Sequence, residues 1–336
     1  MSKFNPIYPW QNALWHSLTQ SRSKLHHAFL MYGRAGVGKY DFALNFSQSL
    51  LCPNKNETGH ACQQCASCHW FSDESHPDFR LITPEQNDSA DEDVSSAKKT
   101  KKKTQISVAQ IRELSDFLSL SSHQSSGLRI VLIHPAEALN LAAANALLKM
   151  LEEPAPDVVF ILIAHQLQRL LPTVLSRCQK IKMPIPDQTQ ALGWLNANGV
   201  SNAAQQLAYM EGSPIKVFNE QADFAHLTQI WGQLALGQKL DPQFVAPLVI
   251  AHSVEMGVIA IQKWIYDILA VKLSQQVRYH LQHANALQAL AEKVNLGKLF
   301  DFQKKTNELR KLATHPLNHE LQMESLLVDY TKLFRV

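Results

Sequence analysis

The chain has 336 residues, 46% of them hydrophobic, and a formal net charge of +3 at pH 7. This length and composition predict two or three folded units with their own cores, and the near-balanced charge implies no broad basic face. The longest apolar run, residues 158–164, is far shorter than the roughly 20 residues that span a bilayer. The first ten residues lack the apolar core of a signal peptide. We therefore expect a cytoplasmic protein that does not enter a membrane.

The first predicted strand leads through a glycine-containing loop into a helix. Residues 27–32 (HAFLMY) form a short apolar run, and residues 33–40 (GRAGVGKY) separate this run from an apolar-rich stretch at residues 41–51. The order of strand, loop and helix is the one in which the phosphate-binding pattern G-x-x-x-x-G-K occurs. The loop is therefore a candidate nucleotide site.

The residues of this loop match G-x-x-x-x-G-K, but the residue that follows the lysine differs from the Ser or Thr that the full pattern requires. Gly33, Gly36 and Gly38 would let backbone N–H groups face a phosphate, and Lys39 would reach the outer phosphates. The next residue is usually a Ser or Thr whose hydroxyl binds Mg²⁺, but this chain has Tyr40, with its oxygen at the far end of a rigid ring. We expect metal positioning to fail. Two interpretations stay open: binding of ATP or ADP without hydrolysis, and a glycine-rich turn that binds no nucleotide.

Four of the five cysteines cluster just after this helix. Cys52, Cys62, Cys65 and Cys68 have the spacing C-x9-C-x2-C-x2-C. In a reducing compartment such a cluster indicates a metal site before a disulfide. Four thiolates complete a closed tetrahedral zinc site, so the predicted Zn²⁺ is structural. An iron–sulfur cluster and free thiols are the alternatives, and the iron–sulfur cluster is disfavoured because no electron route is evident.

A highly charged segment follows at residues 85–104 (EQNDSADEDVSSAKKTKKKT). It contains an acidic block, a Ser/Ala middle and a lysine block, with one valine, and it cannot bury enough apolar surface to order itself. We interpret it as a flexible insertion. Its lysines could bind DNA phosphates, but a solvated loop is the favoured interpretation.

Beyond this insertion, strands alternate with helices. Ser107 is a candidate N-cap of a helix with an apolar face. The apolar runs at residues 129–133 (RIVLI) and 158–164 (VVFILIA) have the length and β-branched content of buried parallel strands. Residues 139–153 between them predict a helix that Pro154 ends. This alternation predicts an α/β fold with a doubly wound sheet.

The run at residues 129–133 is followed by His134, where an active phosphate-loop ATPase has an acidic residue that supports Mg²⁺. The first carboxylate after it is Glu137. A histidine offers no hard anionic oxygen to Mg²⁺. This second defect, independent of Tyr40, indicates a nucleotide site without turnover.

After Pro184 and Pro186 the strand pattern ends and helical spacing dominates. Apolar residues recur at steps of three and four, for example at Val258, Ile261 and Ile265. Such spacing is typical of one buried helical face. The C-terminal half is therefore predicted to be all-helical.

Four stretches, in this order, resemble the clamp-loader branch of AAA+ proteins: HAFLMYGRAGVGK, AAANALLKMLEEP, LLPTVLSRC and EGSPIKVF. With a four-cysteine module inserted after the first helix, the chain resembles the delta-prime members of that family, from bacterial DNA polymerase III. The resemblance covers most of the chain and weakens after Phe218.

The resemblance implies a RecA-like AAA+ domain at residues 1–184, with the zinc module at about 52–68, then a small helical lid at 185–219 and a helical collar at 220–336. It also implies a hetero-pentameric ring with gamma/tau and delta subunits, which loads a sliding clamp on primer-template DNA. The chain would be a component of the polymerase holoenzyme without catalytic activity of its own. Its role would be that of a scaffold.

The family's Ser-Arg-Cys motif matches Ser176, Arg177 and Cys178. The resemblance implies that Arg177 acts as an arginine finger, in trans, on ATP bound to a neighbouring gamma or tau subunit. A planar, always charged guanidinium suits this role. Judged from the residues alone, such an arginine is usually a member of a surface ion pair. Two departures from active members fit an inert subunit: Ala164 and His165 stand where the sensing Thr would follow the strand, and Ile215 stands where an ATP-contacting arginine is expected.

Two other functions remain as alternatives. The first is an active phosphate-loop ATPase of the gamma/tau kind, against which Tyr40 and His134 argue. The second is a zinc-dependent DNA-binding module that uses the lysine-rich run at residues 98–103.

Overall fold

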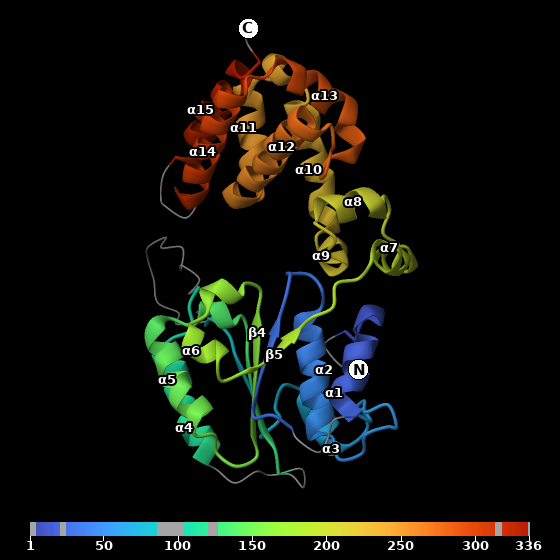
Figure 1. Ribbon diagram of the computed structural model, residues 1–336, viewed down its shortest axis with the longest axis vertical. Helices are drawn as coiled ribbons and strands as arrows, with labels where there is room; N and C mark the ends of the chain where they lie inside the picture. Colours follow the sequence, from blue (N-terminus) through green and yellow to red (C-terminus); the bar gives the residue numbers. More distant parts are fainter. Residues whose placement is uncertain (1–4, 21–24, 86–103, 120–126, 313–317, 335–336) are drawn as a thin grey trace, which may run out of the picture. The chain divides into compact units, whose positions relative to one another are not determined.

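A computed structural model describes residues 5–20, 25–85, 104–119, 127–312 and 318–334. The segment predicted to be a flexible insertion lies outside the described residues except at its two ends. The chain divides into two compact units, Met1–Pro186 and Asp187–Val336 (Figure 1).

The first unit is built on a parallel five-stranded sheet in the order β2-β3-β4-β1-β5. The strands are β1 (Ala28–Tyr32), β2 (Phe79–Ile82), β3 (Arg129–Ile133), β4 (Val158–Ala164) and β5 (Gln179–Lys182). The predicted α/β fold class is confirmed. The two apolar runs predicted as buried strands are β3 and β4, with the predicted bounds.

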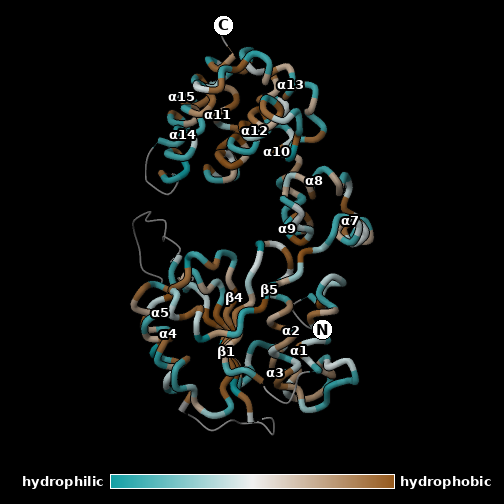
Figure 2. The backbone as a smooth tube through the Cα atoms, in the orientation of Figure 1, coloured by the Kyte–Doolittle hydropathy of each residue, from teal (hydrophilic) through white to brown (hydrophobic). Residues whose placement is uncertain are grey.

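Helices cover both faces of this sheet (Figure 1). One side carries α1 (Asn12–Gln20), α2 (Lys39–Leu51) and α3 (Ala66–Ser72), and the other carries α4 (Val108–Ser119), α5 (Leu141–Glu152) and α6 (Pro172–Leu175). Successive side chains of a strand point to opposite faces. In β4, therefore, Phe160 and Leu162 pack on the α4–α5 side, whereas Ile161 and Ile163 pack on the α2 side. Figure 2 shows the hydrophobic residues gathered along the strands.

Local signals set several of these bounds. The Ser107 hydroxyl accepts a hydrogen bond from the backbone N–H of Gln110 at 3.4 Å, which confirms the predicted N-cap of α4. Asn140 caps α5 in the same way, through the N–H of Ala143. Among the described residues, the 3-10 helices are η1 (Pro9–Gln11), η3 (Ala136–Ala138), η4 (Leu167–Arg169), η5 (Gly237–Lys239) and η6 (Leu281–His283).

The two edge strands were not predicted. Strand β2 has no fully buried residue, and β5 buries only Ile181. Edge strands need apolar residues on one face at most, and four residues are too few for a clear alternation. Pairing with β3 and β1, which is a tertiary effect, defines them.

The second unit is all-helical, as predicted. Its helices are α7 (Gln188–Ala197), α8 (Ala203–Tyr209), α9 (Pro214–Asn219), α10 (Gln221–Leu234), α11 (Pro242–Ile250), α12 (Val254–Ser274), α13 (Ala284–Lys293), α14 (Leu296–Leu312) and α15 (His319–Lys332). The face of α12 predicted from spacing is buried, and beside it the indole N–H of Trp264 donates to the Tyr330 hydroxyl at 2.9 Å. The Tyr330 hydroxyl in turn donates to the Leu234 carbonyl at 2.6 Å. These two bonds satisfy the Trp264 indole N–H and the Tyr330 hydroxyl within a large aromatic core.

Residues of the predicted lid and of the predicted collar contribute to one hydrophobic core. Leu195 and Leu207 belong to the same buried cluster as Trp231 and Trp264.

Within the described residues, no single helix is long and apolar enough to cross a membrane. Helices α11 and α12 together have the length and composition for it, but they are bent by 119° at their junction.

Candidate functional sites

The phosphate loop lies between β1 and α2, at the position expected from the sequence. Lys39, the first residue of α2, is 4% exposed. Its ammonium group donates to the carbonyl oxygens of Gly33 at 2.7 Å and Arg34 at 2.6 Å. Burial lowers the pKa of Lys39 to about 8, although the negative charge of Glu137 acts to raise this pKa. The lysine predicted to bind outer phosphates thus bonds to its own loop.

Side chains of the N-terminal segment donate hydrogen bonds to this loop. The sequence analysis did not predict these contacts. The indole N–H of Trp10 donates to the Val37 carbonyl at 3.1 Å, and the Gln11 amide donates to the carbonyls of Val37 and Gly38 at 2.9 and 3.0 Å. Gly38 has φ +84°, and a Cβ there would lie 2.4 Å from the ring of Tyr8. A glycine is therefore required both by the backbone and by the close aromatic ring.

Aromatic side chains meet at the two positions, Tyr40 and His134, where the sequence predicts defects in magnesium binding. The rings of Tyr40 and His134 stack with centroids 4.9 Å apart, and His165 meets His134 edge-on at 5.8 Å. Burial, and then the charges of His165 and Lys39, lower the pKa of His134 to about 4. His134 is therefore a neutral imidazole at pH 7, stacked on a phenol, and the pair offers no anionic oxygen to Mg²⁺.

The first carboxylate after β3, that of Glu137, is hydrogen-bonded to backbone N–H groups. Glu137 Oε1 accepts hydrogen bonds from the backbone N–H groups of His165 and Gln166, the latter at 2.6 Å. These bonds fix the chain where it leaves β4. Glu137 thus has a structural role at the carboxyl end of the sheet, next to His134.

The structure brings the four predicted metal ligands together. The sulfurs of Cys52, Cys62, Cys65 and Cys68 all lie within 4.8 Å of one another. The separations of Cys52 from Cys62 and from Cys65 are 3.6 and 3.9 Å, and Cys62 lies 4.0 Å from Cys68. Zn–S bonds of about 2.3 Å in a tetrahedron place neighbouring sulfurs about 3.8 Å apart. The donor set therefore fits a zinc ion.

Secondary structure positions these thiols. Cys52 is the C-cap of α2, Cys65 is the N-cap of α3, and Cys68 lies in the first turn of α3. The backbone N–H of Gln64 lowers the pKa of Cys62 to about 6, whereas burial raises the pKa values of Cys52 and Cys68. Zinc binds the thiolate form, so its binding would release protons from the buried thiols. Two helices and the loop between them thus converge on one ion site.

The cysteine module also packs against the rest of the first unit. The indole N–H of Trp15 donates to the Thr58 carbonyl at 3.0 Å, and the Trp15 ring stacks on His60 with centroids 4.4 Å apart. The Ser67 hydroxyl donates to the Leu51 carbonyl at 3.1 Å. A metal that orders residues 52–68 therefore supports contacts of α1 and α2 as well.

Arg177 lies just after α6, with its side chain about one third exposed (32%). One terminal nitrogen, Nη2, is 2.6 Å from Glu152 Oε1. The other, Nη1, donates to the Thr173 carbonyl at 2.9 Å and to the Ser176 hydroxyl at 3.3 Å. Ser176 thus contacts the guanidinium directly, whereas Cys178 is buried in the core on the α4–α5 side of the sheet. The sequence did not single out Glu152.

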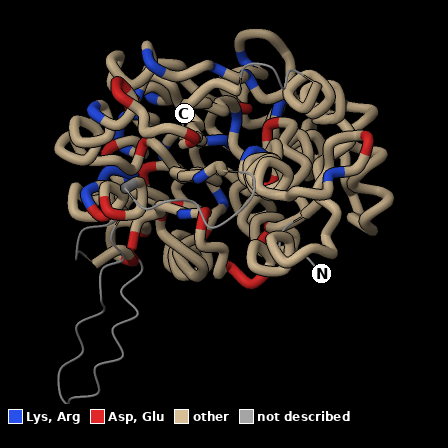
Figure 3. The backbone as a smooth tube through the Cα atoms, turned by 90° about the horizontal axis from the view of Figure 1, so that it is seen from below, with Lys and Arg blue, Asp and Glu red and all other residues tan. Residues whose placement is uncertain are grey.

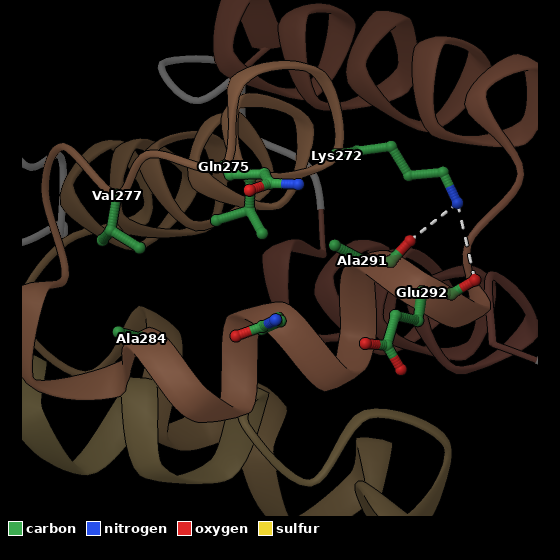
Figure 4. Close-up of a pocket in the computed structure, with 8 residues that line it drawn as sticks. Lys272, Gln275, Val277, Ala284, Ala291 and Glu292 are labelled. Carbon is green, nitrogen blue, oxygen red and sulfur yellow. Dashed lines mark hydrogen bonds between the residues drawn. The ribbon is translucent and has the colours of Figure 1, made fainter.

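A further cavity, of about 420 Å³, lies in the second unit beside α12 and α13. Figure 4 shows Lys272 reaching the last turn of α13, where its ammonium group donates to the Ala291 carbonyl at 2.8 Å and to the Glu292 carbonyl at 3.5 Å. A cation on the last carbonyls of a helix stabilises its C-terminus. Lys272 therefore has a structural role in this cavity.

Comparison with known proteins agrees with these features. A family model described as "DNA polymerase III, delta subunit" matches residues 10–187. The DNA polymerase III subunit delta' of Pseudomonas aeruginosa is 32% identical over 344 aligned residues, which cover 97% of this chain and 98% of the relative. The chain belongs to the DNA polymerase III delta-prime family. This result confirms the resemblance found in the sequence.

Two further comparisons are with another delta' subunit, which matches over a shorter range, and with a solved structure. The delta' subunit of Haemophilus influenzae is 32% identical over 57% of this chain and 53% of its own length. Among solved structures, a gamma-subunit-related protein from Thermotoga maritima aligns over 97% of this chain and 100% of its own, with 16% identity and a TM-score of 0.47.

Proposed function

We propose that this delta-prime family member is the clamp-loader subunit that carries no working ATPase site of its own and supplies Arg177 to the ATP site of a neighbouring subunit. The single observation that carries this proposal is the stacked pair of Tyr40 and His134 in place of the magnesium ligands. A subunit that cannot turn over ATP still contributes to hydrolysis if it presents a guanidinium to another subunit's triphosphate.

The bonds within the phosphate loop support an inert site. Lys39 is satisfied by two loop carbonyls, so a nucleotide would have to replace both bonds. Side chains of Trp10 and Gln11 hold the other end of the loop. If the loop binds ATP or ADP, the residues in contact with it would be Gly33, Gly36, Gly38 and Lys39. In this proposal the bound nucleotide is not hydrolysed.

The exposure of Arg177 supports its role in trans. A finger must reach a partner's phosphate while its own subunit fixes its direction. Two observations support these conditions: about a third of the Arg177 side chain is exposed, and the carbonyl of Thr173 and the hydroxyl of Ser176 accept its hydrogen bonds.

The remaining parts of the proposal concern assembly. Residues 185–219 would form a lid and residues 220–336 a collar, through which the chain joins gamma/tau and delta subunits in a five-membered ring. The zinc ion would hold the cysteine module in place, and its closed four-sulfur set leaves no position for a substrate. The ring would act on a sliding clamp and primed DNA in the cytoplasm.

The two alternatives have less support. An ATPase of the gamma/tau kind would need a magnesium ligand at Tyr40 or His134. A DNA-binding module would depend on residues 98–103, which lie outside the described residues. Acidic and basic residues alternate along the backbone drawn in Figure 3, and the formal net charge is only +3; this near-balanced charge does not favour a DNA-binding module.

The proposal is tested by co-purification from the native cell. With an affinity tag on the full chain, we expect clamp-loader ATPase subunits to be recovered with it in fixed proportion after a wash at high salt. Recovery of the tagged chain without those subunits, from cells in which they are present, would contradict the assembly role.

A further inference from the structure

Glu152 is the acidic partner of Arg177. It is the last residue of α5, and its carboxylate, about half exposed (49%), lies 2.6 Å from Arg177 Nη2. The neighbouring acidic residue, Glu153, is the C-cap of α5 and lines a different groove with Arg112 and Lys149. Two adjacent carboxylates at one helix end thus have different surroundings.

We propose that Glu152 is a positioning residue for Arg177, an inference that rests on the function proposed above. The Glu152 carboxylate, the Thr173 carbonyl and the Ser176 hydroxyl contact both terminal nitrogens of the guanidinium. Three acceptors fix the plane of the group. A guanidinium has five N–H donors, so these three contacts leave donors for a phosphate.

The benefit of this arrangement is preorganisation. A free arginine side chain loses rotamer freedom when it binds, and a side chain that is already ordered loses less. Glu152 comes from α5, and Thr173 from α6, which packs on it. The guanidinium is therefore held between two elements of the same rigid unit, as a group that acts across a subunit boundary requires.

A competing role for Glu152 would have an effect of the opposite sign on the rate of hydrolysis. A carboxylate near the guanidinium would compete with a phosphate for the same cation, and its removal would then raise activity. The hydrogen bonds from Arg177 to Thr173 and Ser176 favour positioning, because a side chain merely neutralised by Glu152 would not need two further acceptors.

The test uses the reconstituted complex and measures ATP hydrolysis under single-turnover conditions. We expect Glu152→Ala to lower the hydrolysis rate at the ATP site next to this subunit about tenfold, the lower end of the effect of groups that orient a functional side chain. Because Gln keeps an acceptor oxygen, Glu152→Gln should retain a rate within about threefold of wild type. The KM for ATP should change less than about twofold, because a finger acts on the transition state.

Controls separate positioning from folding and from the finger itself. Glu153→Gln, at the same helix end, should leave the rate unchanged, and all variants should melt at the wild-type temperature because a half-exposed ion pair contributes little to stability. If Arg177→Ala lowers the rate but Glu152→Ala leaves it unchanged or raises it, the inference about Glu152 is overturned and the proposed function stands. If Arg177→Ala itself has no effect, the proposed function fails first.

Discussion

A complex that contains Arg177→Ala is expected to hydrolyse ATP about 10³-fold more slowly at the site next to this subunit, the lower end of the effect of an arginine finger. The guanidinium would stabilise charge that develops on the transferred phosphoryl group, so its loss should lower kcat and leave ATP binding nearly unchanged. Pre-steady-state hydrolysis with the assembled ring measures this directly. Clamp loading on primed DNA should fall with it.

Two further variants make this result specific. Arg177→Lys keeps the charge but not the planar fork of donors, and we expect it to recover only a small part of the rate. Arg169→Ala removes another exposed arginine from the same region, in η4, and should have no effect. Size-exclusion chromatography should show intact assembly for all three variants. A wild-type rate with Arg177→Ala in an intact ring would remove Arg177 from the mechanism.

Loss of the metal is expected to produce the second large effect, on stability. We predict one zinc ion per chain and a fall of about 10 °C in melting temperature for Cys65→Ala, which corresponds to roughly 3 to 5 kcal/mol in a unit of this size. The physical reason is that residues 52–68 pack on Trp15, and an unliganded loop would release these contacts. Elemental analysis and thermal melting followed by tryptophan emission measure both quantities.

Cys178→Ala is the matched control for this prediction. Cys178 is another cysteine of the first unit, but it is buried in the hydrophobic core on the α4–α5 side of the sheet. We expect this variant to keep its zinc and to lose much less stability than Cys65→Ala. Equal zinc content in Cys65→Ala and wild type would show that the four sulfurs are not the ligand set.

The central strands and the cysteine site could be predicted because their signals are local. Strand β4 is a continuous apolar run, and β3 is one after Arg129; both are buried at every residue, so their bounds can be read directly from the sequence. The cysteine spacing brings ligands from two helix ends together through one short loop, and few other arrangements satisfy four thiolates.

The contacts around the phosphate loop and around Arg177 join residues that are far apart in the sequence, so no local pattern predicts them. Gln11 and Val37 are 26 residues apart, and Glu152 and Arg177 meet only because α5 packs against α6. Tyr40 and His134 were each identified as defects from the sequence. Their mutual stacking depends on the parallel order of β1, β4 and β3 in the sheet.

The most direct test of the account is ATP turnover by the purified chain alone, with Mg²⁺ and without partner subunits. We predict a rate indistinguishable from that of a Lys39→Ala variant, because the stacked rings of Tyr40 and His134 leave no ligand for the metal. Sustained hydrolysis by the wild-type chain that disappears in Lys39→Ala would contradict the account and would identify the chain as an ATPase in its own right.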